Sequence, residues 1–189
     1  MENAPEPEMD APKPNAGAFK PNALESYSVI VLECGGRFLL LKRAPHKRFA
    51  PNLWTGIGGR VEADEFGSLA ASAWRELREE TGIAPASVTG FTLRRVVLNA
   101  RPGDPLSVLL YFSGHLQEPV LPDCPEGTLA WLTAAQVAEL ELAGTSRTAL
   151  PKVIEDILRD PQGREPVQVG VAVFRPTGAF AGVVWASDG

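Results

Sequence analysis

Six strand-like runs occur along the chain in three consecutive pairs, and turn residues separate the two members of each pair. Gly and Pro are common in the separating segments, because these residues favour the backbone conformations of tight turns. Each pair therefore predicts an antiparallel hairpin. The pairs are residues 27–32 with 37–42, residues 90–98 with 106–116, and residues 167–174 with 180–185.

Three further segments carry apolar residues at helical spacing, and they lie between the strand-like pairs. Gly82 is a suitable stop for the first of them, because glycine readily adopts the left-handed conformation that follows many helices. The mixture of hairpins and helices predicts an α/β fold in which helices cover a mixed β-sheet. The predicted helices are residues 68–81, 134–143 and 146–159.

The length of 189 residues suits one domain with extensions. Residues 1–24 are rich in Pro, Ala, Asn and acidic residues and predict a flexible tail, which leaves residues 25–160 for the domain and residues 161–189 for a C-terminal hairpin extension. No run approaches the ~20 apolar residues that a membrane span needs. The N-terminus also lacks the pattern of a secretory signal, so we expect a cytoplasmic protein with reduced Cys34 and Cys124.

Acidic residues outnumber basic ones, 23 to 18, which gives a formal net charge of -5. This balance argues against broad nucleic-acid binding. It is compatible with a small phosphorylated ligand, provided that the carboxylates gather around divalent cations and a few Lys or Arg residues line the same cleft. For the oligomeric state, we expect a monomer or a homodimer.

The first predicted helix carries three carboxylates beside its apolar stripe. Glu76, Glu79 and Glu80 are spaced i, i+3 and i+4, so they share one face. Their mutual repulsion and their position near the helix C-terminus both oppose local stability. A divalent cation such as Mg2+ would turn this repulsion into coordination. A solvated acidic face, partly balanced by Arg75 and Arg78, would explain the pattern without a metal.

The segment from Gly59 to Ile83 resembles the Nudix box of the Nudix hydrolases. Gly59 and Glu65 match the loop positions of the box, and the run from Arg75 through Ile83, RELREETGI, matches its end at every specified position. The resemblance extends over about residues 26–160. It implies an α/β/α sandwich around a mixed sheet, and hydrolysis of a nucleoside diphosphate linked to another moiety with Mg2+ or Mn2+.

One departure from the family pattern is the spacer between Glu65 and Arg75. It has nine residues, 66–74, where the family usually has seven. We expect the extra residues to lengthen the loop or the first helical turn, where Ser68 is a candidate N-cap. The distance of Glu65 from the metal depends on how this insertion folds.

The resemblance implies specific roles for the residues of the box. The metal ligands would be the carboxylates of Glu76, Glu79 and Glu80 together with the backbone carbonyl of Gly59, and Arg75 would orient the carboxylates. The general base of the family comes from the box or from a later loop. Glu79 and Glu80 are the candidates inside the box. Outside it, Glu126 precedes a Trp-containing strand, although an exposed loop acid is the alternative for that residue.

The segments around the box supply candidates for substrate binding. Arg43 and Arg60 are the cations that we expect at the substrate phosphates. Trp54 and Asn52 offer a flat face and a hydrogen-bonding edge for a base, although a core position is an equal alternative for Trp54.

The resemblance implies a small phosphorylated nucleotide as the substrate. The segment from Asn52 to Glu62 is similar to family members that cleanse nucleoside triphosphates, so a nucleoside triphosphate pyrophosphohydrolase is the leading interpretation. ADP-ribose or a dinucleotide, and the 5′ end of an RNA, are the alternative substrates. The alternative function is a noncatalytic nucleotide-binding sensor module, which would bind nucleotide equally with and without Mg2+.

Overall fold

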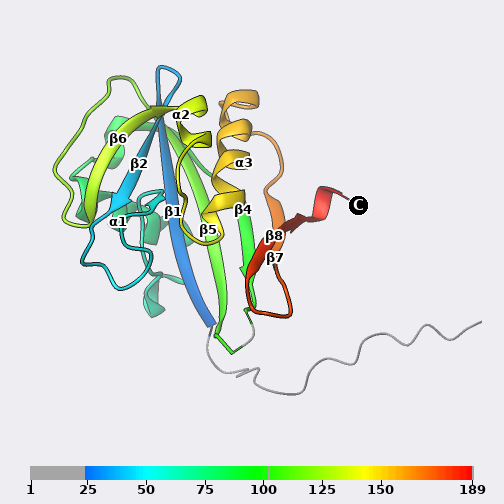
Figure 1. Cartoon of the computed structure of the whole chain (residues 1–189). Helices are drawn as coiled ribbons and strands as arrows, with labels where there is room; N and C mark the ends of the chain where they lie inside the picture. The colour runs from blue at the N-terminus through cyan, green and yellow to red at the C-terminus, as the bar shows by residue number, and fades with distance from the viewer. Residues whose placement is uncertain (1–23, 102, 189) are drawn as a thin grey trace, which may run out of the picture.

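The structure, a computed structural model, describes residues 24–101 and 103–188, and within them eight strands form one mixed sheet (Figure 1). The order is β3-β2-β1-β5-β4-β7-β8, and β6 pairs with β2. The pairs β1–β5 and β4–β7 are parallel, whereas the remaining named pairs are antiparallel. The strands are β1 (Leu24–Cys34), β2 (Arg37–Arg43), β3 (Trp54–Thr55), β4 (Val88–Asn99), β5 (Leu106–Leu116), β6 (Gly127–Thr133), β7 (Gln168–Phe174) and β8 (Phe180–Trp185).

All three predicted hairpins are present as antiparallel pairs, β1–β2, β4–β5 and β7–β8. The predicted start of the domain differs by one residue, because Leu24 already pairs with Leu106 at the beginning of β1. The rest of the predicted tail, residues 1–23, lies outside the described residues. No strand was predicted at β3, which has only two residues, Trp54 and Thr55.

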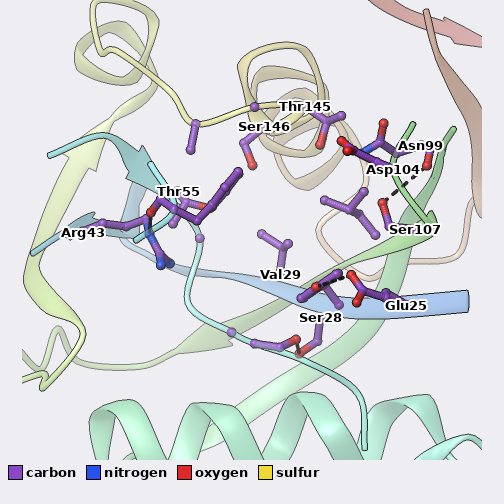
Figure 2. Close-up of a pocket in the computed structure, with 18 of the residues that line it drawn as sticks. Glu25, Ser28, Val29, Arg43, Thr55, Asn99, Asp104, Ser107, Thr145 and Ser146 are labelled. Carbon is purple, nitrogen blue, oxygen red and sulfur yellow. Dashed lines mark hydrogen bonds between the residues drawn. The ribbon is translucent and has the colours of Figure 1, made fainter. Parts of the chain in front are cut away.

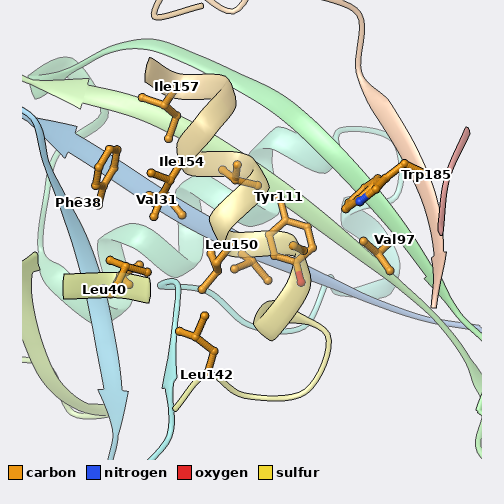
Figure 3. Packing of buried hydrophobic residues seen from close by; sticks show 14 of the residues in the cluster. Val31, Phe38, Leu40, Val97, Tyr111, Leu142, Leu150, Ile154, Ile157 and Trp185 are labelled. Carbon is orange, nitrogen blue, oxygen red and sulfur yellow. The ribbon is translucent and has the colours of Figure 1, made fainter. Parts of the chain in front are cut away.

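Helices cover both faces of the sheet (Figure 1). Helix α1 (Leu69–Thr81) lies on one face, and α2 (Ala134–Ala138) and α3 (Ser146–Arg159) lie on the other. Strand β1 contributes side chains to the hydrophobic clusters on both faces of the sheet. Val31 packs in the cluster with α3, and Ile30 packs in the cluster with α1. Figure 3 shows the first of these clusters around α3. The predicted α/β/α sandwich is therefore confirmed, and no helix in the described part of the chain is long and apolar enough to cross a membrane.

Helix α2 is shorter than the predicted helix over residues 134–143. It ends at Ala138 because the following backbone pairs with β3 instead of continuing the helix. The Trp54 amide donates to the Glu141 carbonyl at 2.9 Å, and the Ala143 amide donates to the Trp54 carbonyl at 2.8 Å. A contact between distant segments thus overrides the local helical pattern.

The C-terminal hairpin extends the sheet, because β7 pairs with β4 from Arg95 to Leu98. Trp185 of β8 is buried, and the Arg95 guanidinium lies 4.3 Å from the centre of its ring. The same guanidinium donates to both oxygens of Asp156 on α3, at 2.6 and 2.8 Å. The hairpin is therefore anchored to the sheet and, through Arg95, to α3.

Candidate active site

A cavity of about 970 Å³ lies beside β1, between the α1 side of the molecule and the C-terminal hairpin (Figure 2). Its acidic end is lined by Glu76, Glu79 and Glu80 of α1, together with Glu126. The glycine loop before α1, which contains Gly56, Gly58 and Gly59, forms part of the wall. The β4–β5 turn and the β7–β8 hairpin line the opposite end. The volume is within the range of small-molecule sites.

The glycine loop lies directly against the backbone of β1. Ile57 exchanges two backbone hydrogen bonds with Ile30, and the Ser28 amide donates to the Gly59 carbonyl at 2.9 Å. A Cβ atom at Gly58 would lie 2.2 Å from the Ser28 carbonyl oxygen, so only glycine fits this position. The Ser28 hydroxyl also donates to the Gly59 carbonyl at 3.5 Å, and metal binding would replace this long hydrogen bond.

Arg75 is the centre of the acidic cluster. Its guanidinium donates to Glu65 at 2.8 and 3.0 Å, to Glu76 at 2.8 Å and to Glu79 at 3.0 Å. It also donates to the carbonyl of Arg60 at 2.9 Å, which ties the loop to α1. The planar guanidinium can hold several carboxylates at once in fixed positions. This geometry is what the predicted orienting role of Arg75 requires.

The long spacer leaves Glu65 in contact with Arg75. The Arg75 hydrogen bonds lower the pKa of Glu65 to about 2, so this carboxylate is ionised at neutral pH. A short 3-10 helix (Ala63–Glu65) ends where the spacer begins, and a turn then leads to α1, which begins at Leu69. Ser68 occupies the N-cap position, but its side chain makes no capping hydrogen bond.

Glu80 is the most buried carboxylate of the cluster, with 7% of its surface exposed. Burial raises its pKa to about 7, and the neighbouring charges of Glu76 and Glu126 act in the same direction. The amide of Gly58 donates to Glu80 at 3.1 Å and partly offsets this effect. Burial also raises the pKa of Glu76. Glu80 is buried and Glu76 is half-buried, and two such carboxylates with raised pKa values are a local excess of negative charge that a cation would relieve.

The donor set fits a divalent cation, because Glu76 lies directly against the loop. A Cβ atom at Gly59 would be only 2.6 Å from the Glu76 carboxylate. Within the described residues, however, no three His, Cys, Asp or Glu side chains already converge as a metal site. The reason is visible in the ion pairs, since Arg75 binds both Glu76 and Glu79. Glu79 would have to turn away from Arg75 to become a ligand.

Glu126 lies in the loop before β6 and lines the same cavity. Its carboxylate forms an ion pair with Lys47. The negative charge of Glu126 also raises the pKa of Glu80, because the two carboxylates lie near each other. The structure therefore brings the predicted out-of-box acid to the acidic end of the cavity.

The predicted substrate-binding residues separate into two groups. Arg43 lines the cavity, where its Nε donates to the Phe49 carbonyl at 2.9 Å. The Arg60 side chain is exposed and forms an ion pair with Glu25 at 3.3 Å. Trp54 packs against the core, and Asn52 lines a separate, smaller depression, so neither contributes to this cavity. The core alternative for Trp54 is the one that the structure shows.

The sequence reasoning missed most of the end of the cavity opposite the acidic cluster. Asn99, Ser107, Phe174 and Phe180 line it. These residues belong to no common motif, since they come from separate strands and loops. The nearest signal was the expected C-terminal hairpin, which carries two of them.

The family of the chain follows from a match to the NUDIX domain model over residues 24–153. The chain belongs to the Nudix family. The match includes the glycine loop, the acidic helix and Glu126. A Nudix hydrolase acts on pyrophosphate bonds of nucleotide derivatives.

Solved structures with the Nudix fold resemble the chain at low sequence identity. A mutator MutT protein from Bacillus halodurans has 21% identity and a TM-score of 0.59, with 86% of this chain and 98% of that chain covered. The dihydroneopterin triphosphate pyrophosphohydrolase of E. coli has 24% identity and a TM-score of 0.55, with 71% and 95% covered. The Nudix domain of Shewanella oneidensis NrtR, complexed with ADP ribose, has 20% identity and a TM-score of 0.53, with 72% and 89% covered. No curated protein matches the chain.

Proposed function

We propose that this Nudix hydrolase is a Mg2+-dependent pyrophosphohydrolase of nucleoside triphosphates, with Mn2+ as an alternative metal. The observation that carries the proposal is a pair of carboxylates, the half-buried Glu76 and the buried Glu80, held against the glycine loop at one end of a large cavity. Such a pair is unfavourable without a cation, and hard carboxylate oxygens are the ligands that Mg2+ prefers.

Glu76, Glu79 and Glu80 would hold the cation, together with the carbonyl of Gly59. When bound, the metal neutralises phosphate charge and lowers the pKa of a bound water. Arg75 keeps Glu76 in place through a 2.8 Å hydrogen bond. Its bonds to Glu65 and to the Arg60 carbonyl fix the guanidinium itself.

Arg43 is the cation of the cavity wall that suits a substrate phosphate, since it lines the cavity near Glu80. For the general base, we favour Glu126, because one of its oxygens contacts the Lys47 ammonium and the other is available to accept a proton from water. Glu79 and Glu80 remain the candidates inside the box.

The choice of a triphosphate rests on the sequence resemblance and on two of the similar structures. One is a mutator MutT protein, and another is a pyrophosphohydrolase of a triphosphate by its name. The NrtR domain was solved with ADP ribose, which keeps that class as the alternative substrate.

The test is hydrolysis of a nucleotide panel with Mg2+, with Mn2+ and with EDTA, with separation of nucleoside monophosphate, pyrophosphate and phosphate. The panel contains normal and oxidised nucleoside triphosphates, ADP-ribose, dinucleoside polyphosphates and triphosphorylated RNA. We expect triphosphates to yield monophosphate and pyrophosphate only when metal is present. Glu79→Gln and Glu80→Gln should each lower kcat by about 100-fold or more.

The matched control is Glu155→Gln, which alters an exposed acid on α3 far from the cavity lining. This variant should keep full activity. Cleavage of ADP-ribose but not of triphosphates would show that the proposed substrate is wrong and that ADP-ribose is the substrate. Nucleotide binding that is equal with and without metal, and without any cleavage, would instead support the sensor module.

A further inference from the structure

The C-terminal hairpin forms a wall of the cavity although it lies outside the matched Nudix domain. Phe174 of β7, Phe180 of β8 and the turn residues Gly178 and Ala179 all line the cavity. The match to the family model ends at residue 153. This wall therefore lies outside the part of the chain that the family model matches.

The hairpin end of the cavity differs chemically from the acidic end. The Phe174 and Phe180 rings lie edge to face, with centres 5.9 Å apart, and both are partly buried. The charged residues there are in ion pairs, Arg101 with Asp104 at 3.6 Å, and Glu25, which adjoins Ser107, with Arg60 at 3.3 Å. Aromatic surface without net charge suits a planar, neutral group rather than a phosphate.

Asn99 gives the same end a hydrogen-bonding group. It lines the cavity beside Asp104 and Ser107, as Figure 2 shows. Its side-chain oxygen is buried and has no hydrogen-bond partner, whereas its backbone carbonyl accepts from Ser107 at 3.4 Å. A buried acceptor without a partner costs about 1–3 kcal/mol. A ligand with an N–H donor would satisfy this amide after a rotation of the side chain.

The hairpin is held rigidly enough to act as a fixed wall. Trp185 of β8 is buried under the Arg95 guanidinium, and Arg95 is in turn paired with the buried Asp156. Gly170 of β7 lies so close to Trp185 that a Cβ atom there would be 2.6 Å from the indole ring. Such close packing fixes the position of the hairpin relative to the sheet.

We propose that the hairpin end is the base-recognition end of the cavity. The base packs against Phe174 and Phe180, and Asn99 accepts a hydrogen bond from an N–H group on its edge. The phosphate chain then extends toward Glu80. This assignment rests on the proposed function, because it takes the ligand to be a nucleotide, and it makes the C-terminal hairpin the determinant of base specificity.

The test uses two substitutions in one turn. Ala179 and Thr177 are both exposed, but only Ala179 lines the cavity. Ala179→Tyr fills the hairpin end, and Thr177→Tyr adds the same side chain outside it. Binding is measured by isothermal titration calorimetry with Mg2+, with nucleoside 5′-monophosphates and inorganic pyrophosphate as probes. We expect Ala179→Tyr to weaken nucleotide binding about tenfold or more, whereas pyrophosphate binding is unchanged and Thr177→Tyr resembles the wild type.

A second variant, Asn99→Leu, tests the hydrogen bond independently. It should reduce the preference among the four monophosphates while leaving the midpoint of thermal unfolding equal or higher, because it removes an unsatisfied acceptor. A purely structural Asn99 would instead lower the midpoint without changing the preference.

The proposal is overturned if Ala179→Tyr binds nucleotides like the wild type, if it weakens pyrophosphate equally, or if Thr177→Tyr has the same effect. It is also overturned if the wild type binds pyrophosphate but no nucleotide. These binding results do not depend on turnover. Loss of the proposed function would appear as intact nucleotide binding without hydrolysis, so the two failures are distinguishable.

Discussion

Two carboxylates of the Nudix box, Glu65 and Glu80, have opposite electrostatic environments. Arg75 lowers the pKa of Glu65 to about 2, whereas burial raises the pKa of Glu80 to about 7. The sequence predicted that the carboxylates of α1 would share a face, since helical spacing determines this. It could not predict which of them is buried, because burial depends on how the glycine loop lies against α1.

Glu80 should make the metal-free protein less stable as the pH rises. Its pKa is about 7 in the folded state and 4.5 ordinarily, so its contribution is fully present below pH 4.5 and is lost as the pH rises through 7. We expect Glu80→Gln, measured by urea unfolding in EDTA, to be more stable than the wild type at pH 8 by up to about 3 kcal/mol. At pH 4.5 the two should be nearly equal. A variant that is less stable at pH 8 would contradict the buried environment of Glu80.

Gly59 should be essential for activity but not for stability. A Cβ atom at this position would meet the end of the flexible Glu76 side chain at 2.6 Å, so Gly59→Ala displaces that carboxylate without moving backbone. We expect kcat to fall about 100-fold, as a displacement near 1 Å can cause, with little change in the urea midpoint. Gly67→Ala is the control, because a Cβ atom there meets nothing within 4 Å. Equal activity of the two variants would show that the position of Glu76 does not matter for catalysis.

Among the helices and strands, the sequence predicted the elements whose pattern lies within one continuous segment. Helix α1 and the three hairpins were predicted because turn residues and periodicity lie within each segment. The C-terminal half of the predicted 134–143 helix was wrong, since the Glu141 and Ala143 backbone pairs with Trp54. The pairing of β7 with β4 was also not predictable, because it joins residues about 70 positions apart.

The attachment of the C-terminal hairpin should depend on Asp156. This carboxylate is 4% exposed and holds Arg95, which packs on Trp185 of the hairpin. Asp156→Ala leaves a buried guanidinium without its partner, so we expect a loss of about 3–5 kcal/mol in the free energy of urea unfolding. Glu155→Ala changes the neighbouring exposed acid and should stay within about 0.5 kcal/mol of the wild type. A small effect of Asp156→Ala would mean that the ion pair does not anchor the hairpin.

On the scale of the whole molecule, the site is a cavity that several distant segments share. The box supplies only its acidic end, and the other walls come from β1, the β4–β5 turn, the segment before α3 and the C-terminal hairpin. The sequence could identify the acidic end because three of its carboxylates, Glu76, Glu79 and Glu80, lie within one continuous motif. Trp54 and Asn52 were predicted at the substrate for their flat face and hydrogen-bonding edge, but the fold packs Trp54 against the core and places Asn52 in a separate depression.

Metal binding to the whole protein should release protons near neutral pH. Glu80 has a pKa of about 7, so at pH 7 about half of the metal-free molecules carry a proton there. A cation that binds the carboxylate displaces this proton. Titration of Mg2+ by calorimetry in buffers of different ionisation enthalpy should therefore show release of about half a proton at pH 7 and much less at pH 9. Glu80→Gln should release fewer protons at pH 7. If wild type and variant release the same number, Glu80 is not the carboxylate that the metal deprotonates, and the ligand set must be assigned without it.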